Sequence, residues 1–396
     1  MRLKLWLAAA TISLSAIQAI AQTPPKTFEF DGQQLLRLRE QPNSPAVKAA
    51  LAEADSAMHA GPFTVTAKPQ APPSGDKHDY MSLARYFWPN PATPNHLPYV
   101  RRDGQSNPQI QSIPDHEYLF KMEEAVHALA LGYVLTGREE YAARATLLLR
   151  AWFLDPKTKM NPNLQYAQAV LGVNGGRGRG ILDARGLPDV TDAVAMIEGS
   201  KSWTAVDDDG IRGWFNDYYT WLTKSDNGRD EADAKNNHAS WYDFQAVGIA
   251  LFLGRQGDAR AMLLAARTRR IAPQIDADGK QPLELGRTKS FGYSVFNLEA
   301  LMRLADYGAA VGVDLWKYQA PGGGSIRAAL DYLIPFALNK ERWSHEDITG
   351  FNGDELRLPL LQAAARFHEP AYLAAADRLK GKETAEMLIL RSRVAP

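Results

Sequence analysis

Two polar clusters in the second half of the chain contain side chains that could transfer protons. The first ends in Asn236-Asn237-His238, with Trp241 one turn later, and directly precedes an apolar stretch of helical periodicity. The second, residues 284–294, contains Arg287 between two glycines and Tyr293 directly after the second glycine. Imidazole and phenol groups can exchange protons with a substrate, while amide and guanidinium groups can stabilise a developing negative charge. The alternative is structural, since Asn caps helices well and a buried Tyr often bonds a backbone carbonyl.

The segment 60–116 is rich in proline and aromatic residues and lacks helical periodicity, which predicts a long ordered loop region. Aromatic rings stack on sugar faces and cations bind carboxylates, so this composition suits a carbohydrate-binding groove. The alternative is that the rings fix the loop to the body of the protein. The substrate-binding residues expected in this segment are Lys77, His78, Tyr80, Trp88, Tyr99 and Arg101, with Lys77 and Arg101 on substrate carboxylates.

A glycine-rich run, residues 174–180, contains Arg177 and Arg179. It lacks the Gly-Lys-Ser/Thr ending of a phosphate-binding loop, and its surroundings are helical, which argues against a nucleotide site. We expect Arg177 to contact an acidic substrate instead, although an exposed loop would have the same composition.

The composition of the 396 residues limits the classes of partner and chemistry. The 45 Lys and Arg residues balance 45 Asp and Glu residues, so we expect no nucleic-acid partner and no anionic membrane partner. The chain has no cysteine, and its eight histidines form no HExxH motif, so we expect neither a metal nor another cofactor. The neighbouring carboxylates Asp230, Glu231 and Asp233 could serve an inverting glycosidase, or could form a solvated face.

Residues 1–21 are typical of a secretory signal peptide. Arg2 and Lys4 precede an apolar run that ends in Ala19-Ile20-Ala21, a small-x-small cleavage sequence. No later segment approaches the length of a membrane span. We therefore expect a periplasmic or secreted protein, and no shift in composition divides residues 22–396 into separate domains.

From residue 117 onward, apolar residues recur at helical spacing and polar turns separate the helices. Three helical hairpins and several further helices, without a run of alternating strands, predict an all-α fold, either an (α/α) toroid, which is an incomplete α/α barrel, or an ordinary helical solenoid. The expected helices cover residues 45–59, 117–136, 138–152, 189–200, 208–223, 238–252, 258–271, 295–311, 325–338, 358–366 and 370–379, after a short leader at 22–44.

Several motifs together resemble the alginate lyase superfamily of polysaccharide lyases. The resemblance covers roughly residues 60–370, and its Arg-to-Tyr interval of six residues is more similar to polysaccharide lyase family 38 than to family 5. It implies a secreted α/α-toroid lyase that acts on alginate or β-1,4-glucuronan. The motifs are the segments 75–82, 88–91, 97–104, 163–168 and 235–238 and the pair Arg287 and Tyr293.

Transferred onto these motifs, the resemblance implies His238, Asn237, Arg287 and Tyr293 as catalytic residues, and it adds Asn163, Gln165 and Trp241 to the substrate-binding residues. β-Elimination of a 1,4-linked uronan requires neutralisation of the carboxylate, removal of the C5 proton and protonation of O4. Asn237, His238 and Arg287 suit the neutralisation.

Tyr293 is the expected base, and a nearby Arg287 would lower its pKa from about 10 toward working pH. One Tyr could serve a syn-elimination as base and acid, whereas an anti-elimination could use His238 as base and Tyr293 as acid. We expect a monomer with an acidic polysaccharide as its partner. A glycoside hydrolase on the same toroid and a non-catalytic polysaccharide-binding protein are the alternatives.

Overall fold

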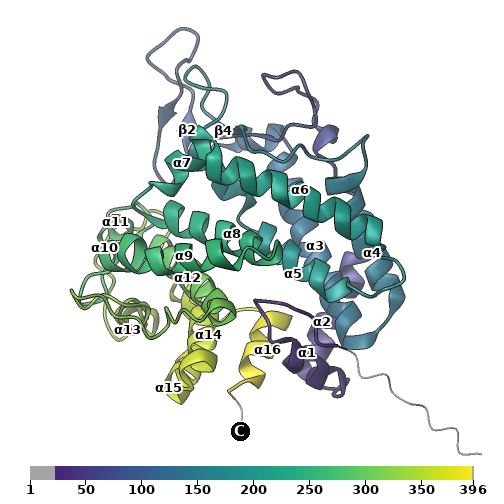
Figure 1. Cartoon of the computed structure of the whole chain (residues 1–396). Coiled ribbons are helices and arrows are strands. Elements are labelled where there is room, and N and C mark those ends of the chain that lie inside the picture. The colour runs from purple at the N-terminus through teal and green to yellow at the C-terminus, as the bar shows by residue number, and fades with distance from the viewer. Residues whose placement is uncertain (1–22, 395–396) are drawn as a thin grey trace, which may run out of the picture.

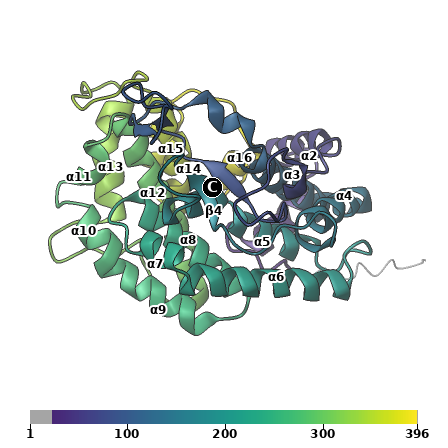
Figure 2. The same cartoon turned by 90° about the horizontal axis from the view of Figure 1, so that it is seen from above.

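The computed structural model describes residues 23–394, so the predicted signal peptide lies outside the described residues (Figure 1). Within this part of the chain, seven helices contact one another in a closed order around the molecule, and further helices pack on their outer sides. Figure 2 shows the helices arranged around the middle of the molecule, with β4 near the centre of the view. The ring follows the order α2 (Pro45–Ala57), α3 (Asp115–Thr136), α5 (Leu187–Ile197), α8 (Asn237–Phe252), α12 (Ser290–Tyr307), α14 (Arg357–Phe367) and α16 (Ala385–Ser392), which returns to α2.

The outer helices complete the second layer. They pack mainly on the ring helix that is adjacent in the sequence, as expected for successive hairpins. They are α4 (Glu139–Leu149), α6 (Ala205–Lys224), α9 (Gln256–Ala266), α13 (Ile326–Ala337) and α15 (Pro370–Ala376). The all-α toroid predicted from the sequence is therefore confirmed.

The helices begin and end at residues with the matching backbone chemistry. The Ser44 side chain accepts a hydrogen bond from the Val47 amide and caps α2, with Pro45 in the first turn. Gly137 ends α3 with a left-handed φ of 73°. In the ring, α8 and α12 lie so close that a Cβ on Gly248 would come within 2.7 Å of the Tyr307 hydroxyl oxygen. Glycine at this position therefore permits the close packing of the two helices that carry the polar clusters.

Some short helices were not predicted from the sequence. The expected leader contains α1 (Gly32–Arg39), and the polar run before His238 contains α7 (Asp226–Ala232). Both are too short for several turns of apolar periodicity, and both pack on neighbouring elements. The short helices α10 (Ala272–Gln274) and α11 (Pro282–Leu285) follow α9.

The segment 60–116 lies above the helices and contains short strands instead of uninterrupted loop (Figure 1). Strand β1 (Met81–Leu83) pairs in parallel with β4 (Tyr166–Ala169), with Met81 opposite Tyr166. Strand β2 (Phe87–Trp88) pairs antiparallel with β3 (Val100–Arg101). These pairs bring residues of the predicted groove over the ends of α8 and α12.

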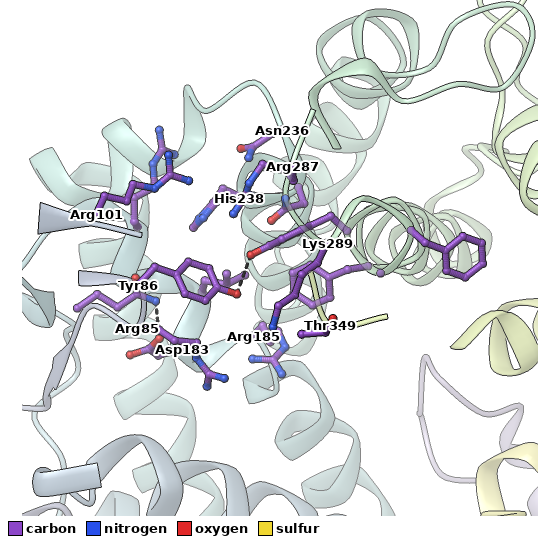
Figure 3. A pocket seen from close by; sticks show the side chains of 18 of the residues that line it. Arg85, Tyr86, Arg101, Asp183, Arg185, Asn236, His238, Arg287, Lys289 and Thr349 are labelled. Carbon is purple, nitrogen blue, oxygen red and sulfur yellow. Dashed lines mark hydrogen bonds between the residues drawn. The ribbon is translucent and has the colours of Figure 1, made fainter. Parts of the chain in front are cut away.

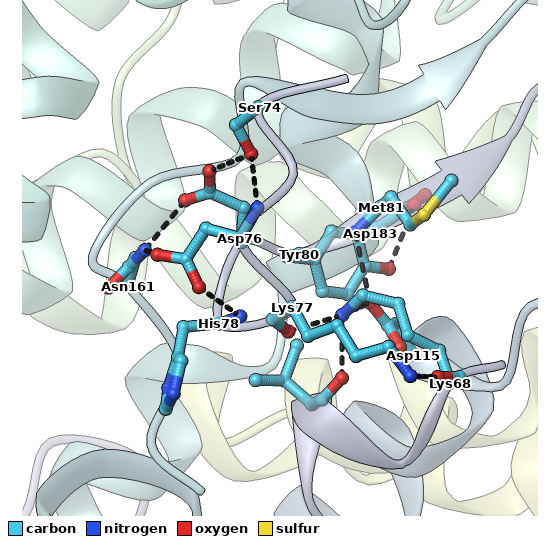
Figure 4. A network of polar contacts seen from close by, with 12 residues as sticks. Lys68, Ser74, Asp76, Lys77, His78, Tyr80, Met81, Asp115, Asn161 and Asp183 are labelled. Atoms are coloured by element: carbon cyan, nitrogen blue, oxygen red, sulfur yellow. Dashed lines mark hydrogen bonds and ion pairs between the residues drawn. The ribbon is translucent and has the colours of Figure 1, made fainter. Parts of the chain in front are cut away.

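A buried ion pair anchors this segment to α3 (Figure 4). Lys68 Nζ lies 2.7 Å from Asp115 Oδ2, and both side chains are fully buried. Lys68 also donates to the Val65 and Lys77 carbonyls, while Asp115 accepts from the Met81 amide at 3.0 Å. The pair therefore joins the start of β1 to the first turn of α3.

A second, partly buried network holds the beginning of the described chain against the ring. His127 Nε2 lies 3.0 Å from Glu29 Oε2, and Asp192 accepts from the backbone amides of Phe28 and Glu29. Burial opposes the charge on His127, but the charge and hydrogen bond of Glu29 raise its pKa to about 9. Burial also raises the pKa of Asp192 to about 7 and that of Glu386, on α16, to about 8.

These shifts predict lower stability at alkaline pH. A raised His127 pKa stabilises the fold fully below its unfolded value of about 6.5, and this contribution is lost as the pH rises through about 9. Asp192 and Glu386, whose pKa values are also raised, favour the fold when protonated, and this contribution is lost between their unfolded values near pH 4 and their folded values of about 7 and 8. We expect the melting temperature to fall between pH 7 and 10, with His127 accounting for up to about 3 kcal/mol. The measurement is thermal unfolding across this range, in which His127→Gln should show a shallower decline; equal declines in both proteins would contradict the assignment.

Among the helices of residues 23–394, none combines the length and apolar character needed to cross a membrane.

Candidate active site

A cavity of about 700 Å³ lies between the segment above the ring and the N-terminal ends of α8 and α12 (Figure 3). Two helix N-termini at one cavity favour a negatively charged ligand, because their first backbone amides and their dipoles both stabilise anions. The side chains at these ends include His238 in the first turn of α8 and Tyr293 in the first turn of α12.

The wall of this cavity is cationic. Among the described residues that line it, seven Lys and Arg side chains stand against three carboxylates, although the whole chain is formally neutral. Such a local excess attracts an anion without a general electrostatic affinity. The cations are Arg85, Arg101, Arg177, Arg179, Arg185, Arg287 and Lys289, and the carboxylates are Asp183, Asp347 and Glu355.

His238 is fixed at the cavity by a buried carboxylate. Its Nδ1 lies 2.5 Å from Glu231 Oε1, and the other carboxylate oxygen of Glu231 accepts from Arg179 at 2.9 Å. Glu231 lies on α7 and is 1% exposed. This contact leaves Nε2 as the imidazole nitrogen available to a ligand, and Figure 3 shows His238 among the cavity residues.

Asn237 is held by a second buried carboxylate. Its backbone amide and its side-chain amide both donate to Glu284, each at 2.7 Å. Burial raises the pKa of Glu284, while the hydrogen bonds from Asn237 and the charge of Arg287 oppose this shift. The carboxamide orientation is thereby fixed at the start of α8.

Arg287 joins the segment above the ring to α12 and Tyr293. Its guanidinium donates through Nε and Nη2 to Asp103, at 3.1 and 2.8 Å. Burial alone would raise the pKa of Asp103, but these hydrogen bonds and the Arg287 charge lower it to about 2. The guanidinium carbon lies 3.8 Å from the centre of the Tyr293 ring, within the range of a cation–π contact.

Two phenol groups are in contact in the cavity. The Tyr293 hydroxyl donates a hydrogen bond to the Tyr86 hydroxyl at 2.8 Å (Figure 3). Burial raises the pKa of Tyr293, and the Tyr86 contact raises it further, although Arg287 lowers it. The expected effect of Arg287 is therefore present, but it does not outweigh burial. Tyr293 is a neutral phenol in the ligand-free protein.

The structure also brings two of the predicted substrate-binding residues to the cavity. Arg101, on β3, lines it and donates to Asp103 at 2.6 Å. Arg177 lines it as well and lies over the Phe87 ring at 5.1 Å. Together with Asn237, His238, Arg287 and Tyr293, they are the predicted site residues that converge.

Two predicted aromatic contacts are buried in the body of the protein. Tyr80 has no exposed surface, and its hydroxyl donates to Asp183 at 3.1 Å. Trp241 is 2% exposed and packs against Phe296 with ring centres 4.9 Å apart. Neither Tyr80 nor Trp241 presents a ring face to a sugar in this arrangement, because almost no surface of either side chain is accessible.

The remaining predicted residues of the segment bond to the protein away from the cavity. Lys77 Nζ donates to the Lys68 carbonyl at 3.0 Å, and His78 Nδ1 contacts the Lys159 carbonyl at 2.6 Å. Two further residues of the segment lie outside the cavity lining: Trp88 donates to the Gln105 carbonyl, and Tyr99 donates to Gln109. Asn163 and Gln165, from the later motif, also lie outside it. Asn163 donates to Asp79, and Gln165 is exposed. These contacts agree with the structural alternative, in which the side chains fix the loop to the body of the protein.

Substitutions of Arg101 and Lys77 are therefore expected to affect the kinetic constants differently. Arg101→Gln should raise KM severalfold with a smaller change in kcat, because a cation that binds the ground state and the transition state alike mainly affects affinity. Lys77→Gln should leave both constants close to wild type, since its amine points at the Lys68 carbonyl. Initial rates over a range of substrate concentrations provide the comparison. A larger loss in kcat than in affinity for Arg101→Gln would place Arg101 among the reacting groups.

Sequence reasoning missed several cavity residues. Tyr86 was visible only as one aromatic residue among many, and nothing in its spacing distinguished it from rings that anchor the loop. Arg185 and Lys289 were not among the expected site residues, although both line the cavity. Lys289 lies two residues after Arg287 in the sequence, and this proximity was a signal that could have identified it.

A second cavity, of about 1,110 Å³, lies behind the first and shares Arg185 and Phe296 with it. Its lining is different: among the described residues of its wall, eight Asp and Glu side chains stand against four Lys and Arg side chains, and burial raises the pKa of several of these acids. The two cavities thus meet at one cation and one ring.

Within residues 23–394, no group of three or more His, Asp or Glu side chains has the arrangement of a metal site.

Comparisons with known proteins agree with this architecture. The sequence profile described as alginate lyase matches residues 64–343. An alginate lyase from Bacteroides ovatus is similar with a TM-score of 0.88 and 36% identity, over 92% of this chain and 99% of that chain. Alginate lyase A1-III from Sphingomonas species A1 shares the fold, with a TM-score of 0.60 and 19% identity over 91% and 98% of the two chains.

A variant of A1-III in complex with a tetrasaccharide shares the fold to the same extent, with a TM-score of 0.60 and 18% identity over 92% and 98% of the chains. A search of curated proteins returns no match. Because the profile covers more than half of the chain, and the Bacteroides ovatus structure matches almost all of it, this chain belongs to the alginate lyase family of polysaccharide lyases.

Proposed function

We propose that this protein cleaves a 1,4-linked uronan, either an alginate or a β-1,4-glucuronan, by β-elimination. The observation that carries the proposal is the convergence of Asn237, His238, Arg287 and Tyr293 in a cavity with an excess of cations. We also propose export to the periplasm or the exterior, on the pattern of residues 1–21.

The first step is neutralisation of the substrate carboxylate. A carboxylate anion makes the proton on the adjacent C5 very weakly acidic, so its charge must be stabilised before that proton can leave. Asn237 and Arg287 offer amide and guanidinium donors that are already oriented by Glu284 and Asp103. Such preorganised donors stabilise the enediolate without reorganisation during the reaction.

Proton transfer completes the elimination. A base removes the C5 proton, the C4–C5 double bond forms, the C4–O4 bond breaks, and an acid protonates O4. Tyr293 is a neutral phenol, which suits the acid; as a base it would have to lose its proton first, a loss that the Arg287 charge favours. His238, through Nε2, is the second candidate base.

Two of the carboxylates that could have served a glycosidase have other partners. Both oxygens of Glu231 are bound, by His238 and Arg179, and Asp233 pairs with Arg269 at 3.0 Å on the surface. They do not form a pair of carboxyl groups that faces the cavity, as an inverting hydrolase requires.

The test is incubation of the purified protein with polymannuronate, polyguluronate and glucuronan. A lyase generates an unsaturated uronate that absorbs ultraviolet light together with each new reducing end. New reducing ends without this absorbance would establish a hydrolase. Binding without any product after long incubation would establish a non-catalytic binding protein.

A further inference from the structure

The Glu231 carboxylate is buried at the cavity, and the mechanism above gives it no task. It is 1% exposed, and each of its oxygens has one charged or chargeable partner: His238 Nδ1 at 2.5 Å and Arg179 Nη1 at 2.9 Å. Burying a carboxylate costs free energy, and its pairing offsets only part of that cost. A buried charge that contacts a candidate catalytic residue therefore suggests a role beyond packing.

We propose that Glu231 is a positioning residue that holds His238 with its proton on Nδ1, so that the free Nε2 serves as the base for guluronate residues. The proposal rests on the lyase function proposed above. Arg179 supports it by donating a hydrogen bond to the second carboxylate oxygen of Glu231 at 2.9 Å.

The hydrogen-bond chemistry of the three groups fixes the tautomer. An ionised carboxylate can only accept, so the Nδ1 that contacts Glu231 carries the hydrogen. In a neutral imidazole the other nitrogen is then an acceptor, and Nε2 is the nitrogen left to the cavity. Arg179 pairs with the other oxygen of Glu231, so the carboxylate has a partner on each side. A third group that orients the base in this way also stabilises the imidazolium that forms.

The stereochemistry of the substrate decides whether His238 or Tyr293 acts as the base. Mannuronate and guluronate differ only at C5: the C5 proton and O4 lie on the same face of the ring in mannuronate and on opposite faces in guluronate. For guluronate, His238 Nε2 takes the C5 proton while the Tyr293 hydroxyl gives its proton to O4. The electron pair of the C5–H bond becomes the new double bond, and that of C4–O4 stays on oxygen. Solvent exchange then returns the proton from the imidazolium to the Tyr293 phenolate.

The test compares Glu231→Gln with the wild type on polyguluronate and polymannuronate. Glutamine preserves the shape but cannot stabilise the imidazolium, so kcat on polyguluronate should fall about 100-fold, within the range of general base catalysis. On polymannuronate, where Tyr293 can act alone, the loss should be at least tenfold smaller. The matched control is Asp233→Asn, which removes an exposed carboxylate from the end of α7 and should leave both activities unchanged.

The pH dependence supplies a second readout. The charged groups that face His238 are Glu231 from α7, Arg179 from the turn at 178–184, Glu284 from α11 and Arg287 from the segment before α12. Loss of the Glu231 anion should move the acidic limb of kcat/KM on polyguluronate to lower pH, whereas Arg179→Gln should move it to higher pH. A residue that only supports folding would shift neither.

Equal losses of Glu231→Gln on both polymers, with an unmoved acidic limb, would overturn the proposal. If Glu231→Gln fails to fold, the direction of the shift in Arg179→Gln still decides: no shift, or a shift to lower pH, would overturn it. These results differ from a failure of the proposed function, in which the wild-type protein would form no unsaturated product from any uronan.

Discussion

Tyr293→Phe is expected to lower kcat by about 10²- to 10⁴-fold on the best uronan, because it removes the only hydroxyl that this mechanism uses to protonate O4. The change leaves the ring beneath Arg287 in place, so the guanidinium contact at 3.8 Å and the carboxylate-binding donors should persist. KM should therefore change less than kcat. The measurement is the rate of ultraviolet absorbance increase over a range of substrate concentrations.

Tyr99→Phe is the matched control for this experiment. Its hydroxyl bonds to Gln109 at 2.7 Å outside the cavity lining, so its loss should leave turnover close to wild type. Near-normal turnover by Tyr293→Phe would show that another group protonates O4, and the role assigned to Tyr293 would be withdrawn.

Lys68→Met is expected to have the largest effect on stability. It removes one partner of a fully buried ion pair and leaves Asp115 without its cation. Breaking such a pair costs about 3–5 kcal/mol, since the remaining charge is uncompensated. Burial already raises the pKa of Asp115 to about 6 against the opposing charge of Lys68. Urea unfolding should show the loss as a lower midpoint with little change in slope.

The double variant Lys68→Met with Asp115→Asn tests the cause. It removes both charges and keeps an oxygen that can accept from the Met81 amide, a bond of 3.0 Å in the protein. Part of the lost stability should return. A single variant within about 1 kcal/mol of wild type, or a double variant no more stable than the single one, would contradict the assignment.

The ring of helices was predictable because its residues agree at several levels. Apolar periodicity predicted the helices of the ring, and Gly137 marked the end of α3, where the structure has it. Other predicted boundaries differ from the structure by a few residues, as at 295–311 for α12 (Ser290–Tyr307). The short α1 and α7 were not predictable, since their few residues carry little periodic signal and their packing partners lie elsewhere in the sequence.

The candidate site was predictable only where sequence neighbours act together. Asn237 and His238 are adjacent, and Arg287 and Tyr293 lie within two turns, so local motifs identified them. Tyr86 reaches Tyr293 across more than 200 residues, and nothing local to either segment encodes that contact. The aromatic loop was misjudged for the same reason: composition cannot distinguish a ring that faces sugar from one that anchors the chain, such as Tyr80.

The different linings of the two cavities bear on the path of the polymer. A polyanion is attracted to the front cavity, but beyond Arg185 it meets a wall rich in acidic side chains, where burial raises the pKa of Glu123, Asp189 and Glu299. Threading a uronan through the ring would move its carboxylates from a wall with many cations to one with few, which is unfavourable for a charge that leaves water. We therefore expect the polymer to enter and the product fragments to leave through the same opening, that of the front cavity.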